Sequence, residues 1–426
     1  MMHRETDISI DMLAKIEGHA SLDIRIRDEK VEDVKLKVLE NKRFDTQAVR
    51  GKPAAAVPQL VSRICGTCSI SHLTCATEAI EKALDVVPSE QTVLLRKLAM
   101  YGTMIRDHAM HLYLFVLPDM FGKDSLLDFA KENSHLIGEC FEIKAAGNAL
   151  STWAAGRAIH PAFSKIGGWS VLPKQEKTKE VIELLKNCRE HALDLAELFG
   201  KCTWKFERDS QFIGLITKDY TFLEGRMGGT SGFRLPESEY YHHLQNVIIP
   251  YSQATAYEFE RKEYMVGALA RMNLNRDALH PDTVRDCSDL LRVFPTGNVF
   301  SNNLAQAIEI VHCIDHSIEL LEGIKIKDEK AKDFKLKAGI GTGAIEAPRG
   351  TLWYGFKINS KGLIDHGHIV IPTAQNQIKL ENDIRALVSG MVKQPKARII
   401  CECEKLIRAY DPCMSCASDF LRVRWL

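Results

Sequence analysis

The sequence predicts a mainly helical α+β protein, with a central bundle of long helices and small β-hairpins near the N- and C-termini. Two patterns support this fold class. Apolar residues recur at helical spacing through several long stretches, and they alternate with polar residues through short stretches near each end. Apolar residues also make up 45% of the 426 positions, which is enough for a sizeable core.

The strand patterns predict one hairpin near each end. Near the N-terminus, residues 22–26 and 34–38 alternate between apolar and polar side chains, and charged residues at 28–30 form the turn. Near the C-terminus, strand character covers residues 351–358 and returns at 368–371 after a turn. We therefore expect small β elements on either side of a helical body.

The helical patterns predict long amphipathic helices between and after these hairpins. Ser69 or Ser71 can cap the first of them, which places Cys65 and Cys68 in the loop at its N-terminus. The helix dipole would favour thiolate over thiol at that position. The expected helices cover residues 69–84, 88–118, 176–199, 303–321, 376–392 and 398–409.

Composition excludes several classes of function. The sequence has 56 basic and 56 acidic residues, so it offers no overall charge for binding nucleic acid or an anionic membrane. It has no run of 18 apolar residues that would predict a membrane span, and residues 1–11 lack the apolar core of an export signal. The twelve cysteines are expected to be reduced. These features predict a cytoplasmic protein with no direct membrane span.

Two Cys-x-x-Cys pairs, Cys65/Cys68 and Cys413/Cys416, predict a four-thiolate metal site if the fold brings them together. A structural zinc site is one alternative, although zinc-binding pairs usually lie close together in the sequence. A redox dithiol is another, although neither pair follows a βαβ pattern. The two halves of the site lie at opposite ends of the chain, and no repeat or linker interrupts it. We therefore expect residues 1–426 to form a single domain.

Four short motifs lie near the start, in the middle and at the end of the chain. They read Ile-Glu-Gly-His at residues 16–19, Arg-Ile-Cys-Gly-Thr-Cys at 63–68, Glu-Ala-Pro-Arg-Gly at 346–350 and Asp-Pro-Cys-Met-Ser-Cys at 411–416. Together they resemble the signature of the nickel–iron hydrogenase large subunit. The resemblance extends from residue 17 to residue 419, and it implies the fold of that family.

The resemblance implies a ligand set for a nickel–iron centre. Cys65 and Cys413 would be terminal nickel ligands, and Cys68 and Cys416 would bridge nickel to iron. Carbon monoxide and cyanide would complete the iron coordination. Soft thiolate ligands suit nickel and low-valent iron, and bridging sulfur lets the two metals share electron density.

Residues around the centre also match the family. Glu17 would accept a proton from Cys413, and His72 would donate a hydrogen bond to the sulfur of Cys68. Arg349, next to Pro348, would direct its guanidinium at the open site and at one cyanide. Asp107 and Asp411 are expected to hold that arginine. The hydroxyl of Thr373 is expected to meet the second cyanide.

A magnesium ion near the C-terminus is also implied by the resemblance. Its ligands would come from Glu40, Gln377 and Asp419. Asp419 departs from the histidine of the family. Many relatives lose a C-terminal tail after that position, whereas only residues 420–426 follow here and most are apolar. We therefore expect maturation without proteolysis, with this tail packed against the body or a partner.

The resemblance implies the catalytic subunit of a hydrogenase, which cleaves H2 reversibly and heterolytically into protons and electrons. No ferredoxin-like cysteine run, dinucleotide loop or P-loop occurs, so the electron carriers would belong to partners. The expected partners are a small iron–sulfur subunit and flavin/iron–sulfur electron-transfer subunits. The short chain resembles the soluble cytosolic group, which includes sulfhydrogenases and bidirectional or electron-bifurcating complexes. The sequence does not distinguish between NAD(P), ferredoxin, deazaflavin and a heterodisulfide as the electron acceptor.

Two other functions compete with this one. The first is a hydrogenase-fold subunit of a complex I-like respiratory assembly, but that lineage lacks the four cysteines. The second is a hydrogen sensor with little turnover. Hydrogen uptake with an artificial dye would distinguish the sensor from the enzyme.

Overall fold

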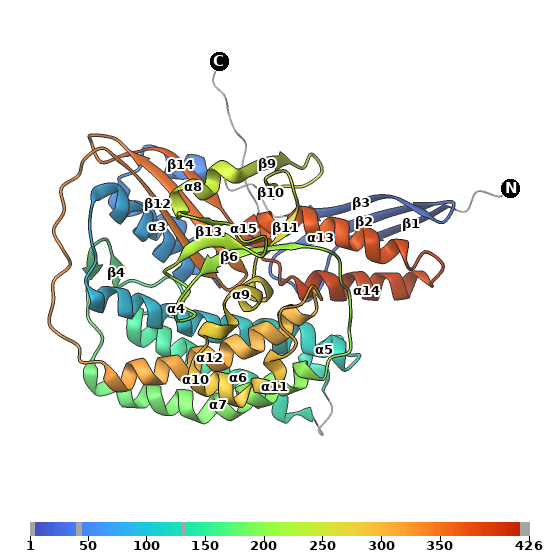
Figure 1. Cartoon of the computed structure of the whole chain (residues 1–426), viewed down its shortest axis with the longest axis horizontal. Helices are drawn as coiled ribbons and strands as arrows, with labels where there is room; N and C mark the ends of the chain where they lie inside the picture. The colour runs from blue at the N-terminus through green and yellow to red at the C-terminus, as the bar shows by residue number, and fades with distance from the viewer. Residues whose placement is uncertain (1–4, 40–44, 130–132, 418–426) are drawn as a thin grey trace, which may run out of the picture.

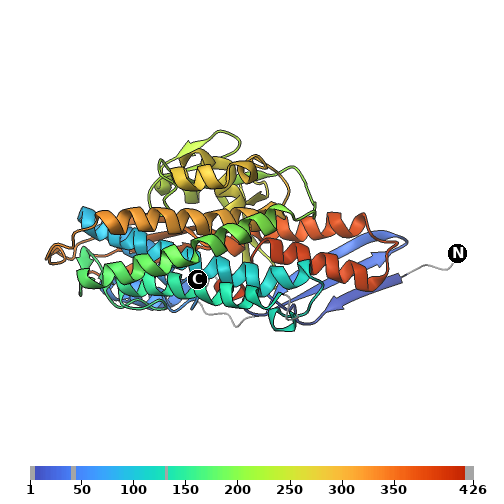
Figure 2. The same ribbon diagram turned by 90° about the horizontal axis from the view of Figure 1, so that it is seen from below.

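Four long helices lie side by side and form the helical body of the molecule (Figures 1 and 2). They are α4 (Glu90–Met110), α6 (His135–Ala155), α7 (Thr178–Gly200) and α12 (Ser301–Gly323). The computed structural model describes residues 5–39, 45–129 and 133–417. In that part of the chain, the predicted bundle and the α+β class are confirmed.

The starts of the predicted helices agree closely with the sequence patterns. Ser89 caps α4, where its hydroxyl accepts a hydrogen bond from the backbone N–H of Thr92. The end of α4 differs, because the chain continues as a π-helical segment, η2 (His111–Val116), before the short α5 (Leu117–Met120). Such π segments are rare and often occur near functional sites.

Helix α6 was not predicted. It is apolar around most of its circumference and shows no clear stripe, so periodicity does not reveal it. It packs tightly on α4 where two glycines meet. A Cβ on Gly102 would lie 2.6 Å from the carbonyl oxygen of Gly147, a contact that no other residue type allows.

A three-stranded antiparallel sheet lies next to the bundle. It consists of β12 (Gly339–Ala347), β13 (Gly350–Ile358) and β14 (Ile364–Val370), in that order. The predicted hairpin corresponds to β13 and β14, and β12 is the strand that the sequence analysis missed. Helix α3 (Ser69–Leu84) packs against this sheet and runs along β12.

Alternate glycines on β12 let α3 approach the sheet closely. A Cβ at Gly339, Gly341 or Gly343 would lie 1.9, 2.1 or 2.5 Å from a backbone carbonyl oxygen of α3. These residues share one face of the strand because side chains alternate along it. These three glycines, the glycine row of β12, therefore set the distance between α3 and the sheet. They thereby also set the position of the loop at the N-terminus of α3.

The N-terminal sheet is also three-stranded and antiparallel. The predicted hairpin corresponds to β2 (Ala20–Arg27) and β3 (Lys30–Val38), and β1 (Glu5–Ile10) adds a further strand. This sheet lies against α13 (Pro372–Ser389) and α14 (Lys396–Ala409) at one end of the molecule (Figure 1). Segments from the two ends of the sequence thus lie together.

Shorter elements cover one side of the bundle. Helix α9 (Ala268–Asn275) is the most relevant to the site. A four-stranded sheet contains β6 (Gln211–Ile216), β7 (Arg226–Gly229), β8 (Arg234–Leu235) and β11 (Tyr264–Met265), and two hairpins contain β4 (Ser164–Lys165) with β5 (Gly168–Trp169) and β9 (Leu244–Ile248) with β10 (Thr255–Phe259). Further short helices are α1 (Asp45–Val49), α2 (Val57–Val61), α8 (Glu237–Tyr240), α10 (Pro281–Asp286), α11 (Ser288–Leu291) and α15 (Met414–Ala417). Among the described residues, no helix is both long and apolar enough to cross a membrane.

Candidate metal centre

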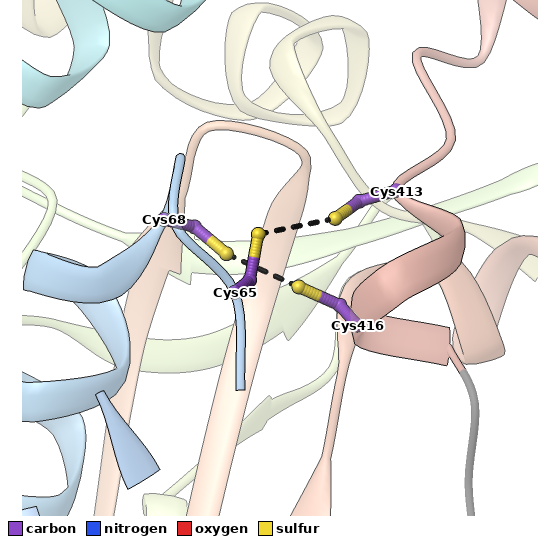
Figure 3. Close-up of side chains that lie close together, drawn as sticks. All are labelled: Cys65, Cys68, Cys413 and Cys416. Atoms are coloured by element: carbon purple, nitrogen blue, oxygen red, sulfur yellow. Dashed lines mark hydrogen bonds between the residues drawn. The ribbon is translucent and has the colours of Figure 1, made fainter. Parts of the chain in front are cut away.

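The four predicted cysteines converge on one point, as Figure 3 shows. All four sulfur atoms lie within 4.8 Å of one another, and all four residues are buried. The Sγ atoms of Cys65 and Cys413 are 3.5 Å apart, and those of Cys68 and Cys416 are 3.1 Å apart. The thiols are free rather than paired as disulfides. A buried set of four convergent thiols is the arrangement that a soft metal requires.

Two segments carry the thiols to this point. Cys65 lies in the loop after α2, and Cys68 is the residue immediately before α3. Cys413 precedes the short helix α15, and Cys416 lies inside it. Asp411 has a backbone φ of 49°, a left-handed conformation that is rare for a residue with a Cβ. This turn directs the chain after α14 into the site.

The thiols differ in acidity because they share hydrogen bonds. The pKa of Cys65 is lowered well below its ordinary value, because hydrogen bonding with the neighbouring thiols, first of all Cys413, favours its thiolate. The pKa of Cys413 is raised well above its ordinary value, because burial disfavours the thiolate. A bound cation would supply the positive charge that lets all four lose their protons.

Glu17 lies beside Cys413, as the sequence predicts. Its Oε2 accepts the S–H of Cys413 at 2.9 Å and the backbone N–H of Ser415 at 3.2 Å. Its Oε1 accepts the hydroxyl of Ser415 at 2.7 Å. The strand-like pairing of Glu17 with Cys413 and the bond from Met414 N to the Glu17 carbonyl hold the two segments together. Ser415 was not predicted as a partner of Glu17.

His72 contacts a different sulfur from the one predicted. Its Nε2 lies 3.5 Å from Sγ of Cys416, and its Nδ1 lies 2.7 Å from the hydroxyl of Tyr354. The sulfurs of Cys416 and Cys68 are only 3.1 Å apart, so His72 meets the predicted thiol pair at the Cys416 member. Burial lowers the pKa of His72 to about 4.

Arg349 lies between the two predicted carboxylates. Its Nη1 donates to Asp107 Oδ2 at 2.6 Å, and its Nη2 lies 3.2 Å from Asp411 Oδ1. Burial opposes the guanidinium charge, but the carboxylates of Asp107 and Asp411 raise the pKa of Arg349 well above its ordinary value. Arg349 is only 4% exposed, yet its Nε and Nη2 lack hydrogen-bond partners within the described residues.

Unpartnered buried donors are costly, so they indicate a polar group that completes the site. Asp107 Oδ1 is likewise buried without a partner among these residues. Thr373 has a hydroxyl that accepts the backbone N–H of Cys413 at 3.0 Å and keeps its own proton to donate. The donor set around the thiols therefore fits a metal centre that carries small hydrogen-bond acceptors.

A second set of buried residues supports Arg349 and was missed by the sequence analysis. Arg271 on α9 donates to the carbonyl oxygens of Ala347 and Pro348, both at 3.0 Å. It also forms ion pairs with Glu309 at 2.6 Å and with Glu346 at 3.0 Å. An arginine in an apolar helix carries no motif, so only the fold reveals this role. Pro348 thus contributes through its backbone.

Asp411 has its own support. Gln306 on α12 donates from Nε2 to Asp411 Oδ2 at 2.8 Å, and its Oε1 lies 2.5 Å from Nδ1 of His111. The other nitrogen of His111 reaches the carbonyl oxygen of Arg408 at 2.8 Å. Of the two carboxylates that contact Arg349, Asp107 therefore lies on α4 itself, whereas Asp411 is held by a side chain of α12.

The predicted cation site falls largely outside the described residues. Glu40, Asp419 and the tail at 420–426 lie beyond them. Gln377 lies on α13, where its Nε2 donates to the carbonyl oxygen of Leu36 at 3.1 Å. Its buried Oε1 has no hydrogen-bond partner in the described part of the chain.

Comparisons with known proteins agree with this geometry. The sequence profile of the nickel-dependent hydrogenase family matches residues 46–154 and 234–419. The alpha subunit of sulfhydrogenase 1 from Pyrococcus furiosus is 33% identical over 98% of this chain and 98% of its own length. The alpha subunit of sulfhydrogenase 2 from the same organism is 30% identical over 98% of this chain and 100% of its own.

Solved structures show the same fold. An NAD+-reducing [NiFe]-hydrogenase in the H2-reduced state superposes with a TM-score of 0.83 and 22% identity, covering 97% of this chain and 99% of that one. A Ni-Fe-Se hydrogenase from Desulfovibrio vulgaris Hildenborough superposes with a TM-score of 0.76 and 20% identity, covering 98% of this chain and 100% of that one. With its four convergent thiols and a family match over more than half of its length, the chain belongs to the nickel-dependent hydrogenase family.

Proposed function

We propose that the four thiolates hold a nickel–iron centre, with Cys65 and Cys413 as terminal nickel ligands and Cys68 and Cys416 as bridges to iron. Hydrogenase activity itself follows from the family, and the ligand assignment is the proposal. The sulfur contacts support it. Sulfur contacts of 3.5 and 3.1 Å join Cys65 to Cys413 and Cys68 to Cys416, so corresponding members of the two motifs form two pairs.

Iron ligands such as carbon monoxide and cyanide would fit the free donors. The unpartnered Nε and Nη2 of Arg349 and the hydroxyl proton of Thr373 can each meet a small acceptor. A cyanide nitrogen accepts hydrogen bonds, whereas carbon monoxide accepts them poorly. The two donors, from separate elements, suit two cyanides better than two carbon monoxides.

When bound, such a centre supplies the redox chemistry that converts H2 into two protons and two electrons. The chain supplies the path for the proton. Glu17 takes the proton from Cys413 Sγ over 2.9 Å, and Ser415 holds the carboxylate in position. Arg349 would supply a fixed positive charge beside a bound centre, because Asp107 accepts a hydrogen bond from one arm of its fork and the carboxylate of Asp411 lies 3.2 Å from the other.

Electrons would leave through partner subunits. Among the described residues, the four cysteines are the sole cluster of metal-ligand type, which supports electron carriers on partner subunits. The Pyrococcus furiosus relatives are alpha subunits, which indicates a multi-subunit enzyme. We propose a small iron–sulfur subunit and flavin/iron–sulfur subunits as partners. We also propose a cytoplasmic location. Residues 1–426 would form a single domain that contains the whole site. The unpartnered Oε1 of Gln377 also supports a magnesium ion near α13.

The observation that carries the proposal is the convergence of four buried thiols from opposite ends of the chain. Metal analysis and infrared spectroscopy of the purified complex test it. We expect nickel and iron in equal amounts, with bands of carbon monoxide and cyanide, and we expect Cys68→Ser to remove those bands because a hard oxygen replaces a bridging sulfur. A complex that turns over hydrogen but contains only zinc would refute the proposal. A complex I-like role would show neither metal at the site.

A further inference from the structure

A buried chain of three side chains ends at one of the site thiols. Tyr354 on β13 and His72 on α3 are both almost fully buried. The Tyr354 hydroxyl lies 2.7 Å from His72 Nδ1, and His72 Nε2 lies 3.5 Å from Cys416 Sγ. The phenol and imidazole rings meet edge to face, with an interplanar angle of 85°.

The direction of these hydrogen bonds follows from the chemistry of the end groups. A metal-bound thiolate has no proton and can only accept, so Nε2 of His72 must carry the proton that points at Cys416. A neutral imidazole carries one proton, which leaves Nδ1 as an acceptor. The Tyr354 hydroxyl must then donate to Nδ1. The thiolate and the phenol thus favour the same tautomer of His72, because the phenol donates to Nδ1 only when the proton is on Nε2.

We infer that Tyr354 is a positioning residue that selects the Nε2–H tautomer of His72 and strengthens its hydrogen bond to the Cys416 sulfur. The inference rests on the proposed function, in which Cys416 bridges the two metals. Hydrogen bonds in a chain polarise one another, so donation to Nδ1 makes the Nε2–H group a better donor. The phenol therefore tunes a metal ligand that it does not touch.

The fold holds this chain rigidly. Tyr354 lies opposite Gly343 on the neighbouring strand, and Gly343 is the glycine that lies against the Cys75 carbonyl of α3. The Cys75 thiol also contacts the Gly343 carbonyl at 3.3 Å and the Leu352 carbonyl at 3.4 Å. The strand that carries the phenol and the helix that carries the imidazole are thereby fixed relative to each other.

Removing the phenol hydroxyl should change the electron density at the metals. A weaker N–H···S bond leaves more electron density on the bridging sulfur and hence on iron. Iron then donates more density into the antibonding orbitals of its carbon monoxide, which lowers the carbon monoxide stretching frequency. The infrared spectrum therefore reports on Tyr354 independently of turnover.

The test compares variants of the intact complex by infrared spectroscopy, thermal unfolding and metal content. We expect Tyr354→Phe to shift the carbon monoxide band to lower wavenumber. Incorporating 3-fluorotyrosine at position 354, a stronger donor of nearly the same shape, should shift the band to higher wavenumber and keeps the test valid if Tyr354→Phe fails to fold. The matched control is Tyr113→Phe, a buried tyrosine whose hydroxyl bonds Glu139 at 3.1 Å, and no shift is expected there.

A double variant separates this role from a structural one. In a His72→Gln background, replacing Tyr354 should produce no further shift, because its effect passes through His72. Unshifted bands in both Tyr354 variants would overturn the inference, and so would a shift that persists in the His72→Gln background. A lower unfolding temperature without a spectral shift would mean a structural role only. If the unmodified complex lacks these bands altogether, the proposed centre fails rather than the role of Tyr354.

Discussion

Glu17 contacts Cys413 and Ser415 through its side-chain carboxylate, so a substitution that changes only this group tests its role. Glu17→Gln keeps the shape and removes the group that titrates. We expect hydrogen–deuterium exchange and hydrogen production to fall by on the order of a hundredfold, the scale of losing an acid–base group. Mass spectrometry of the exchange products measures this. Nickel and iron content should stay unchanged, and undiminished exchange in a fully metallated variant would exclude Glu17 as the proton acceptor.

Arg349 depends on geometry as well as charge. Lysine in its place keeps the charge but loses the planar fork that reaches Asp107 and Asp411 together. We expect Arg349→Lys to reduce hydrogen oxidation by at least tenfold, the loss that corresponds to about 1.4 kcal/mol of transition-state stabilisation.

An exposed arginine provides the control for Arg349→Lys. Arg285 is also held by two aspartates, Asp282 and Asp286, but it is exposed. Exposed ion pairs contribute little, so Arg285→Lys should leave the rate of dye reduction unchanged. Equal rates in the two variants would mean that Arg349 contributes only its charge, or nothing.

At the residue scale, the sequence motifs identify most of the site. The four cysteines converge, Glu17 contacts Cys413, and Arg349 lies beside Asp107 and Asp411. His72 contacts Cys416, whose sulfur lies beside that of the predicted Cys68, and only the folded arrangement of the two segments decides which sulfur it meets. Ser415 and Tyr354 were not predicted, because only folding brings them to Glu17 and His72.

At the element scale, the glycine row of β12 makes a specific prediction. A Cβ on Gly343 would lie 2.5 Å from the Cys75 carbonyl oxygen and 3.0 Å from the Ala79 nitrogen. Gly343→Ala should push α3 away from the sheet and reduce the free energy of unfolding by about 1–3 kcal/mol, as overpacking does. Nickel occupancy should fall as well, because Cys68 moves with the helix. Calorimetry and metal analysis measure the two effects.

The control for this substitution is Gly138 on α6, where an added Cβ would meet nothing within 4 Å. Gly138→Ala should leave the stability unchanged or raise it by up to ~1 kcal/mol, because glycine is costly inside a helix. Should Gly343→Ala behave like Gly138→Ala, the close approach of β12 and α3 would not be what sets the position of Cys68.

Elements with a strong local pattern are the ones that the sequence reveals. Helix α12 and helix α7 each carry an apolar stripe, and both were predicted to within two residues at each end. Helix α6 lacks such a stripe, and β12 is rich in glycine, which is unusual in a strand. Their structures depend on packing partners distant in the sequence, so no local window contains the signal.

At the scale of the whole molecule, one buried ion network connects several helices behind the site. Glu309 pairs with Arg271 and lies 2.8 Å from His108 Nε2, and Tyr220 donates to it at 2.8 Å. Burial alone would raise the pKa of Glu309, but the charge of Arg271 lowers it from 4.5 to about 2. The unfolded chain therefore binds a proton at a higher pH than the folded chain does.

This pKa shift predicts a dependence of stability on pH. Because the folded-state pKa is depressed, the contribution is present above about pH 4.5 and is lost as the pH falls toward 2. The contribution of Glu309 to the free energy of unfolding is on the order of 3 kcal/mol. Urea unfolding should show that Glu309→Gln is destabilised at pH 6 but that the difference from the unmodified protein shrinks between pH 4.5 and pH 2. A constant difference across that range would contradict the assignment.

The position of the four thiols in the chain has a consequence for synthesis on the ribosome. Cys413 follows Cys68 by 345 positions. At roughly 5–20 residues per second, the first pair waits about 20–70 s for its partner pair. During that interval Cys65 and Cys68 form an open chelate, available to zinc or to an oxidant. A metal that binds in that interval has two of the four thiolates, so the complete four-thiolate site exists only after the second pair has been made.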